Sequence, residues 1–158
     1  QGAMIPFLDT KALRNGTHRL AFAPDGALHV GKTHLSWAGN NGIVRIASPA
    51  SLPPLIQSVH LARTGFEVRF TEAMDPDSLA PAMRSFRYLY HVKYGSPKVD
   101  QLILESVGSL SADGKVLTLP MKEIRQGFVH EISLAGAKSA KGRELLGPIA
   151  YYQVVKAK

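Results

Sequence analysis

The chain has 158 residues, of which 45% are hydrophobic and 20% charged, a balance that is typical of a folded protein and excludes a disordered tail. The absence of cysteine excludes disulfides, thiolate metal sites, a cysteine nucleophile and covalently attached c-type haem within this chain. The net charge of +7 is spread along the sequence without a basic run, which argues against nucleic-acid binding, and no apolar run approaches the ~20 residues that span a bilayer.

The first part of the chain predicts a small antiparallel sheet. Residues 1–4, Gln-Gly-Ala-Met, resemble the remnant of a cleaved expression tag, and we set them aside from the fold. Alternating apolar residues predict strands at 18–23 and 27–32, and the sequence PDG at 24–26 predicts a tight hairpin turn between them. A third strand is expected at 43–46. Three short strands bury little by themselves, so this segment is not expected to form a complete domain.

Three histidines lie close together in this segment, at His18, His29 and His34. Three imidazoles hold Zn²⁺ or Cu²⁺ if their nitrogens converge at about 2.0–2.1 Å from the metal. Here one histidine lies at a strand start, one on a strand and one in a loop, which does not favour convergence. We therefore expect exposed histidines and no metal, and keep a histidine-based metal site as the weaker alternative.

The stretch PASLPP at 49–54 predicts a proline-containing linker between a β segment at 5–48 and a second region at 55–158. Strands in that second region are expected at 55–61, 65–71, 84–92, 101–107, 115–119, 128–134 and 149–155. Apolar residues at 66, 68 and 70 alternate with charged ones, which indicates a sheet with one solvated face. Seven short strands over this length predict an all-β, immunoglobulin-like seven-stranded sandwich.

The segment FRYLYHVKYGSPKVD at 86–100 combines aromatic, basic and histidine residues around a Gly-Ser-Pro turn. Such a mixture is typical of contact surfaces, because tyrosine offers a large contact area at a small entropy cost. The candidate interaction residues are Tyr88, Tyr90, His91, Lys93, Tyr94, Lys98 and Asp100. The alternative is that these tyrosines pack at the edge of the core with their hydroxyls in water.

Motifs for catalysis are missing from the sequence. There is no phosphate-binding glycine loop, no GxSxG nucleophile turn and no HExxH metal motif. His130 and Glu131 are neighbours on an expected strand, so their side chains point to opposite faces. Because His130 shares its face with Phe128 and Ile132, we expect a packed, hydrogen-bonded histidine rather than a metal ligand. We therefore expect no catalytic residue and no enzyme activity in this chain.

Two sequence stretches resemble known families. RLAFAPDGALHVGKTHLSW, followed by GIVRI, resembles a blade of the propellers of soluble sugar dehydrogenases and sorbosone dehydrogenases. VRFTEAMDPDSL resembles bacterial Ig-like modules. Over a longer span, including YHVKYGSPKVD, the chain resembles the C-terminal region of planctomycete-type propeller proteins of this dehydrogenase-like class, which often carry a c-type haem domain. The resemblance implies a last propeller-blade fragment followed by an Ig-like domain.

This resemblance implies a parent protein that is periplasmic or secreted and possesses a quinone or haem c cofactor, with no cofactor in the present chain. A single partial blade cannot close a propeller, and none of the family's quinone-binding or catalytic residues can be transferred to this sequence. We therefore expect a noncatalytic interaction domain that braces the parent's propeller or haem domain. The alternative is a carbohydrate-binding module, since aromatic side chains next to polar groups also suit sugars.

Overall fold

The structure is a computed structural model that describes residues 2–7, 10–33, 41–47, 50–90 and 95–156. The chain forms two compact units. One unit is Leu8–Leu52, and the other joins Gln1–Phe7 to Pro53–Lys158. The border between the units, after Leu52, lies inside the stretch that we expected to be a linker.

The first residues of the chain, which we set aside as a tag remnant, take part in the fold. Strand β1, Gly2–Met4, pairs antiparallel with strand β12, Ile149–Gln153. Ile5 then packs against the core of the sandwich. Residues 5–7 therefore belong with the sandwich rather than with the blade-like segment in which we had placed them.

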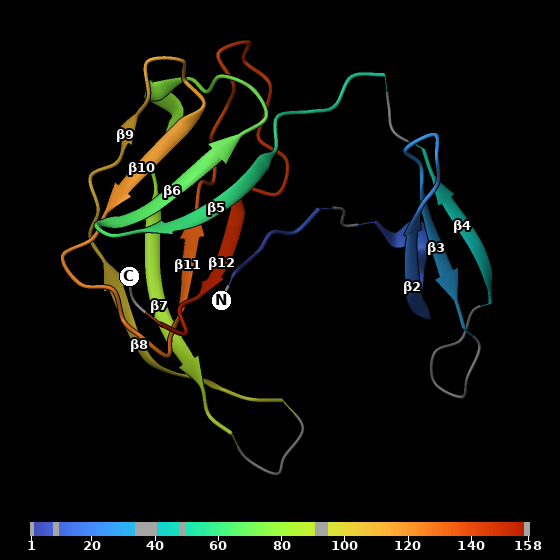
Figure 1. The fold of residues 1–158 in the computed structure, drawn as a ribbon, viewed down its shortest axis with the longest axis horizontal. Helices are drawn as coiled ribbons and strands as arrows, with labels where there is room; N and C mark the ends of the chain where they lie inside the picture. The colour runs from blue at the N-terminus through green and yellow to red at the C-terminus, as the bar shows by residue number, and fades with distance from the viewer. Residues whose placement is uncertain (1, 8–9, 34–40, 48–49, 91–94, 157–158) are drawn as a thin grey trace. The chain divides into compact units, whose positions relative to one another are not determined.

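Nine strands among the described residues build the sandwich unit. Besides β1 and β12 they are β5 (Ile56–Ala62), β6 (Gly65–Phe70), β7 (Ala82–Tyr88), β8 (Lys98–Leu104), β9 (Ser109–Leu110), β10 (Val116–Pro120) and β11 (Val129–Ser133). One sheet has the order β1-β12-β11-β7-β8 and the other β5-β6-β10-β9, and Figure 1 shows the two sheets face to face.

The strand order is that of an immunoglobulin-like sandwich. The sheet β5-β6-β10-β9 matches the ABED sheet of immunoglobulin constant domains, and β12-β11-β7 matches the GFC sheet, with β8 added next to β7. The seven strands that we expected are all present, and the all-β sandwich is confirmed. The two additional strands, β1 and β9, escaped the sequence analysis because three and two residues are too few to show a period.

The core lies between the inner faces of the two sheets. Phe66, Val68 and Phe70 of β6 are buried and alternate with exposed Glu67 and Arg69, as the sequence predicts. The opposing sheet contributes the buried side chains Met83, Ile132, Ala150 and Tyr152. Alternation then places the intervening residues of β7, β11 and β12 on the outer face of the five-stranded sheet.

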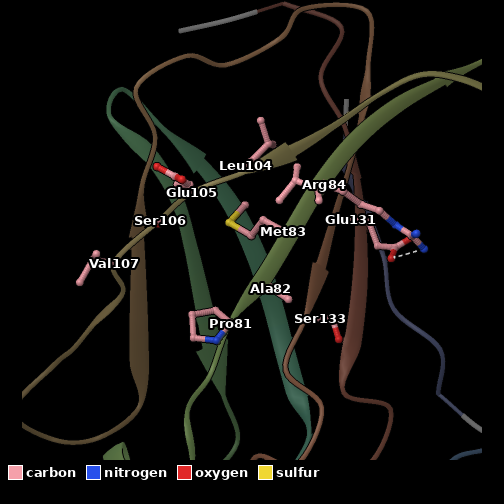
Figure 2. Close-up of a pocket in the computed structure, with 11 residues that line it drawn as sticks. Pro81, Ala82, Met83, Arg84, Leu104, Glu105, Ser106, Val107, Glu131 and Ser133 are labelled. Atoms are coloured by element: carbon pink, nitrogen blue, oxygen red, sulfur yellow. Dashed lines mark ion pairs between the residues drawn. The ribbon is translucent and has the colours of Figure 1, made fainter.

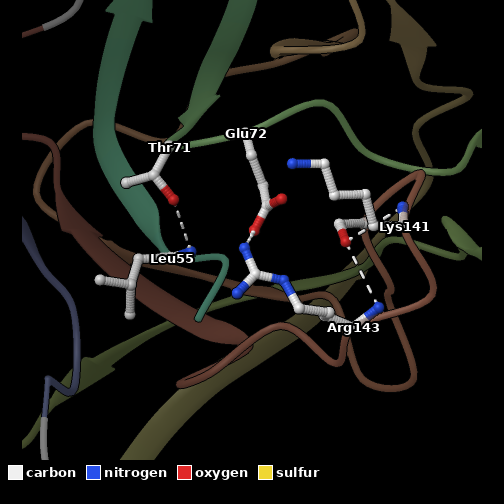
Figure 3. Close-up of polar contacts among 6 residues, drawn as sticks. Leu55, Thr71, Glu72, Lys141 and Arg143 are labelled. Atoms are coloured by element: carbon white, nitrogen blue, oxygen red, sulfur yellow. Dashed lines mark hydrogen bonds and ion pairs between the residues drawn. The ribbon is translucent and has the colours of Figure 1, made fainter. Parts of the chain in front are cut away.

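Side-chain contacts at one end of the sandwich tie loops to strand ends, as Figure 3 shows. The hydroxyl of Thr71 accepts a hydrogen bond from the backbone N–H of Leu55 at 2.9 Å, which joins the end of β6 to the start of β5. Glu72 forms an ion pair with Arg143 in the turn that precedes β12. The loops at this end are thus anchored by interactions across long sequence separations.

The smaller unit is a three-stranded antiparallel sheet of β2 (Thr17–Phe22), β3 (Leu28–Lys32) and β4 (Gly42–Ile46), in that order. Its hairpin turn uses Gly26 at φ 79°, and the carboxylate of Asp25 accepts a hydrogen bond from the N–H of Ala27 at 3.0 Å. Arg45 on β4 pairs with Asp25 at 2.6 Å, which lowers the pKa of that carboxyl.

One face of this sheet is largely apolar. Two rows of paired residues cross the sheet on that face, Phe22–Leu28–Ile46 and Leu20–Val30–Val44. Val30 at the centre is buried, but Leu20 and Phe22 on the edge strand are exposed. The sheet therefore presents apolar side chains that are covered on β3 and open on β2.

Candidate interaction surface

Two of the candidate tyrosines are exposed where β7 ends. We expected this strand to continue to residue 92, but it ends at Tyr88, after which the N–H of Leu89 donates to the carbonyl of Pro97 at 3.2 Å. Tyr88 is 54% exposed and Tyr90 is 96% exposed. We call Tyr88, Leu89 and Tyr90 the tyrosine surface. The described chain thus leaves Tyr90 almost uncovered, whereas it covers about half of Tyr88.

Tyr88 is held in place by neighbouring aromatic and basic side chains. Its ring meets the ring of Phe86 edge-on, with centroids 5.4 Å apart. The ammonium of Lys98, paired with Tyr88 across β7 and β8, lies 4.2 Å from the centroid of the Phe86 ring. Phe86 itself is fully buried on the outer face of the sheet. Tyr88 is therefore positioned by packing, whereas Tyr90 extends into solvent.

Asp100 lies in a bulge of β8 rather than in the tyrosine surface. Its φ of 53° belongs to the left-handed region, and the strand register shifts at this point between Ser85 and Arg87 of β7. Its carboxylate forms an ion pair with Arg87, and its carbonyl accepts a hydrogen bond from Arg125 at 2.9 Å. These bonds give Asp100 a role in fixing the bulge.

Three of the seven candidate residues have no described position in the structure. His91, Lys93 and Tyr94 lie outside the described residues, so the structure brings together Tyr88 and Lys98 of the seven candidates, with Tyr90 close in sequence.

The histidine trio is likewise incomplete. His34 lies outside the described residues, while His18 is on edge strand β2 and His29 on central strand β3. Within the described part of the chain, no three His, Asp or Glu side chains gather as a metal site would require.

A charged cluster on the outer face of the sheet escaped the sequence analysis. The carboxylate of Glu131 on β11 is only 7% exposed and pairs with Arg84 of β7 at 2.6 Å and with Lys98 of β8 at 3.4 Å. Alternation places Glu131 on the outer face, but the sequence does not tell which strands flank β11. The cluster could be found only once β7 was known to lie beside β11.

A hollow next to this cluster opens along β8. It has a volume of about 690 Å³ and is lined by the charged residues Arg84, Glu105 and Glu131, by Ser106 and Ser133, and by apolar residues of β7, β8 and the segments next to them. Figure 2 shows the Arg84–Glu131 ion pair on one side of this hollow and Val107 on the other. We call it the β8 hollow. Its lining holds the Arg84–Glu131 ion pair and a further carboxylate, that of Glu105.

His130 lies inside the core, as expected, but without the hydrogen bond that we expected. The ring is fully buried, with the Phe66 ring centroid 5.2 Å away. Neither ring nitrogen has a hydrogen-bond partner of normal geometry among the described residues, although a contact with the backbone of Phe128 partly offsets the lowering of the pKa of His130. Burial lowers the pKa of His130, because charging the ring inside the apolar core is unfavourable.

This lowered pKa predicts a loss of stability in weak acid. Below about pH 6.5 the unfolded chain protonates His130 while the folded chain does not, so the free energy of unfolding falls by up to ~1.4 kcal/mol per pH unit until the folded pKa is reached. Urea unfolding between pH 7.5 and 5.5 measures this slope. We expect His130→Leu to reduce the slope and His60→Leu, at an exposed position of β5, to leave it unchanged. An equal slope in both variants would contradict the attribution of this pH dependence to His130.

Comparison with family models gives no match, and comparison with curated proteins gives none. Among solved structures, the chain is similar to "Crystal structure of the S-layer protein rSbsC(31-844)", with 21% sequence identity and a TM-score of 0.47. The similarity covers 65% of this chain and 14% of that one. A similarity of this extent has no bearing on function.

Among the described residues, no helix has the length and apolar character needed to cross a membrane.

Proposed function

We propose that the chain is a noncatalytic interaction module whose sandwich binds another protein domain through the tyrosine surface. The observation that carries the proposal is the 96% exposure of Tyr90, next to the exposed side chains of Tyr88 and Leu89. Exposure of large aromatic side chains to water is unfavourable, and clusters of exposed aromatic side chains are typical of protein contact sites.

The surroundings of the tyrosine surface fit a contact site. Lys98, paired with Tyr88 across β7 and β8 and lying over the Phe86 ring, places a charge beside the aromatic side chains, as in the polar rim of a contact site. Packing of Tyr88 against Phe86 and Lys98 fixes one ring before binding, so little side-chain entropy would be lost there.

The three-stranded unit supports the same role. Phe22 is 79% exposed on the apolar face of this sheet, where a packed sheet partner would normally lie. Two separate apolar surfaces on one chain favour a module that is completed by a partner. The partner that we propose is the propeller or haem domain of a periplasmic or secreted, dehydrogenase-like parent protein, and this part rests on the sequence resemblance alone.

Calorimetric titration of the chain with the separately produced propeller part of such a parent protein tests the proposal. We expect a dissociation constant in the micromolar range or tighter, and about tenfold weaker binding by Tyr90→Ala, since an aromatic anchor typically contributes more than ~1 kcal/mol. Val107→Ala is the matched control, because Val107 is equally exposed but follows the other end of β8. Absence of binding, or equal binding by Tyr90→Ala, would contradict the proposal.

A further inference from the structure

A second hollow lies on the outer face of the five-stranded sheet and crosses all of its strands. It has a volume of about 540 Å³ and is lined by Gly2, Ala3, Met4, Tyr88, Lys98, Val129, Tyr151 and Gln153. We call it the β12 hollow. The strand register explains its composition, because Tyr151 and Gln153 alternate with the buried Tyr152 and so reach the outer face next to Val129.

The lining combines aromatic rings with a few hydrogen-bonding groups. Tyr88 and Tyr151 supply the rings, and the amide of Gln153 both donates and accepts hydrogen bonds. The volume is within the range of small-molecule sites, and rings with convergent polar groups are the arrangement that sugar rings require. We propose that the β12 hollow binds an acidic sugar, with its ring against Tyr151 and its carboxylate on Lys98.

The charged residues in and next to the hollow favour the binding of an anionic sugar over that of a neutral one. Among the described residues that line it, Lys98 is the one that carries a charge. The neighbouring Glu131 is paired with both Arg84 and Lys98, so one carboxylate faces two cations and the cluster retains one net positive charge. The ammonium of Lys98 has three N–H donors, and of the described residues Glu131 accepts at 3.4 Å, a weak bond that leaves the ammonium able to bind a carboxylate.

Lys98 is also fixed in position, which makes it suitable as a ligand-binding group. Its ammonium lies 4.2 Å from the centroid of the Phe86 ring and 5.9 Å from that of Tyr151. Its side chain is 32% exposed, so it is partly held by packing and partly accessible to solvent. A ring stacked on Tyr151 would therefore have a cation within reach of a substituent carboxylate.

This site is separate from the proposed protein-binding role, although Tyr88 borders both. Tyr90 is not among the residues that line the β12 hollow, and Tyr151 is not part of the tyrosine surface. Tyr90→Ala and Tyr151→Ala thus report on the two proposals independently.

The experiment is calorimetric titration of the full chain with an oligogalacturonate, a cello-oligosaccharide of equal length and a poly-glutamate peptide. The first probe is an acidic sugar, the second a neutral sugar, and the third an acidic chain without sugar rings. We expect the oligogalacturonate to bind at least about tenfold more tightly than either of the others, and its binding to weaken with added salt.

Variants then assign the site. We expect about tenfold weaker oligogalacturonate binding by Tyr151→Ala, because the stacking ring is lost. Lys98→Met alone would leave the nearly buried carboxylate of Glu131 with Arg84 as its charged partner, which could destabilise the fold. The double variant Lys98→Met/Glu131→Gln avoids this, and we expect it to bind the oligogalacturonate no more tightly than the cello-oligosaccharide. Lys115→Met, directly before β10 of the opposite sheet, and Tyr90→Ala should bind like the unsubstituted chain. Thermal unfolding of each variant shows that it is folded.

Three results would overturn the inference. The first is no binding of oligogalacturonate by the folded chain. The second is equal binding of the poly-glutamate peptide, which would indicate attraction by the net charge of +7 alone. The third is undiminished binding by folded Tyr151→Ala.

Discussion

Arg84→Met is expected to lower the free energy of unfolding by about 2–3 kcal/mol, below the range for a fully buried pair because Arg84 itself is half exposed. The carboxylate of Glu131 is nearly buried, and without Arg84 it keeps Lys98, at 3.4 Å, as its charged partner. A buried charge that loses its main partner destabilises a protein more than the pair stabilised it. Chemical unfolding at neutral pH measures the difference.

The double variant Arg84→Met/Glu131→Gln separates the loss of the pair from general damage to β7. Removing both charges leaves no uncompensated carboxylate, so we expect most of the lost stability to return. Arg63→Met, at an exposed position in the turn between β5 and β6, is the matched control and should change stability by less than about 0.5 kcal/mol. A double variant as unstable as the single one would show that Glu131 is not the cause.

Phe66→Ala is expected to lower the free energy of unfolding by about 3–5 kcal/mol, the largest effect of any substitution considered. Phe66 is fully buried, and its ring lies 5.2 Å from that of His130 and 5.4 Å from that of Tyr152. The substitution leaves a cavity where the two sheets meet. Denaturant unfolding with a constant m-value measures the loss.

Two variants control this prediction. Phe66→Leu keeps most of the apolar volume and should lose less than about 1.5 kcal/mol. Tyr90→Ala removes an aromatic ring of similar size from an exposed position and should leave stability nearly unchanged. If Phe66→Ala were no more destabilising than Tyr90→Ala, the core would not be where the structure places it.

The candidate site was less predictable than the fold, and the reason differs between residues. The exposed tyrosines could be identified because aromatic residues next to charges stand out in one short segment, 86–100. Tyr151 and Gln153, in contrast, belong to an ordinary alternating strand that gives no signal by itself. They become part of a site because β12 lies in the same sheet as β7 and β8.

Local sequence was sufficient for seven of the nine described strands of the sandwich and for the three-stranded sheet. The period-2 alternation of β6 and the turn glycines at Gly26 and Gly114, both with positive φ, are properties of neighbouring residues and so can be read without knowing the fold. Tertiary structure alone decided where strands end and where they are irregular. Strand β7 ends at Tyr88, and β8 has a bulge at Asp100, whose carboxylate pairs with Arg87 and whose carbonyl accepts a hydrogen bond from Arg125.

Pairing between distant strands was equally beyond the sequence. Strand β1 forms because β12 offers it an open edge, and Glu131 is charged yet nearly buried because β7 and β8 bring Arg84 and Lys98 to it. These outcomes depend on which strands become neighbours, and that is set by the packing of the whole sandwich rather than by any one segment. The sequence by itself thus determined the seven expected strands of the sandwich and their inner faces, and the tertiary structure determined β1, β9 and which residues gather on the outer face.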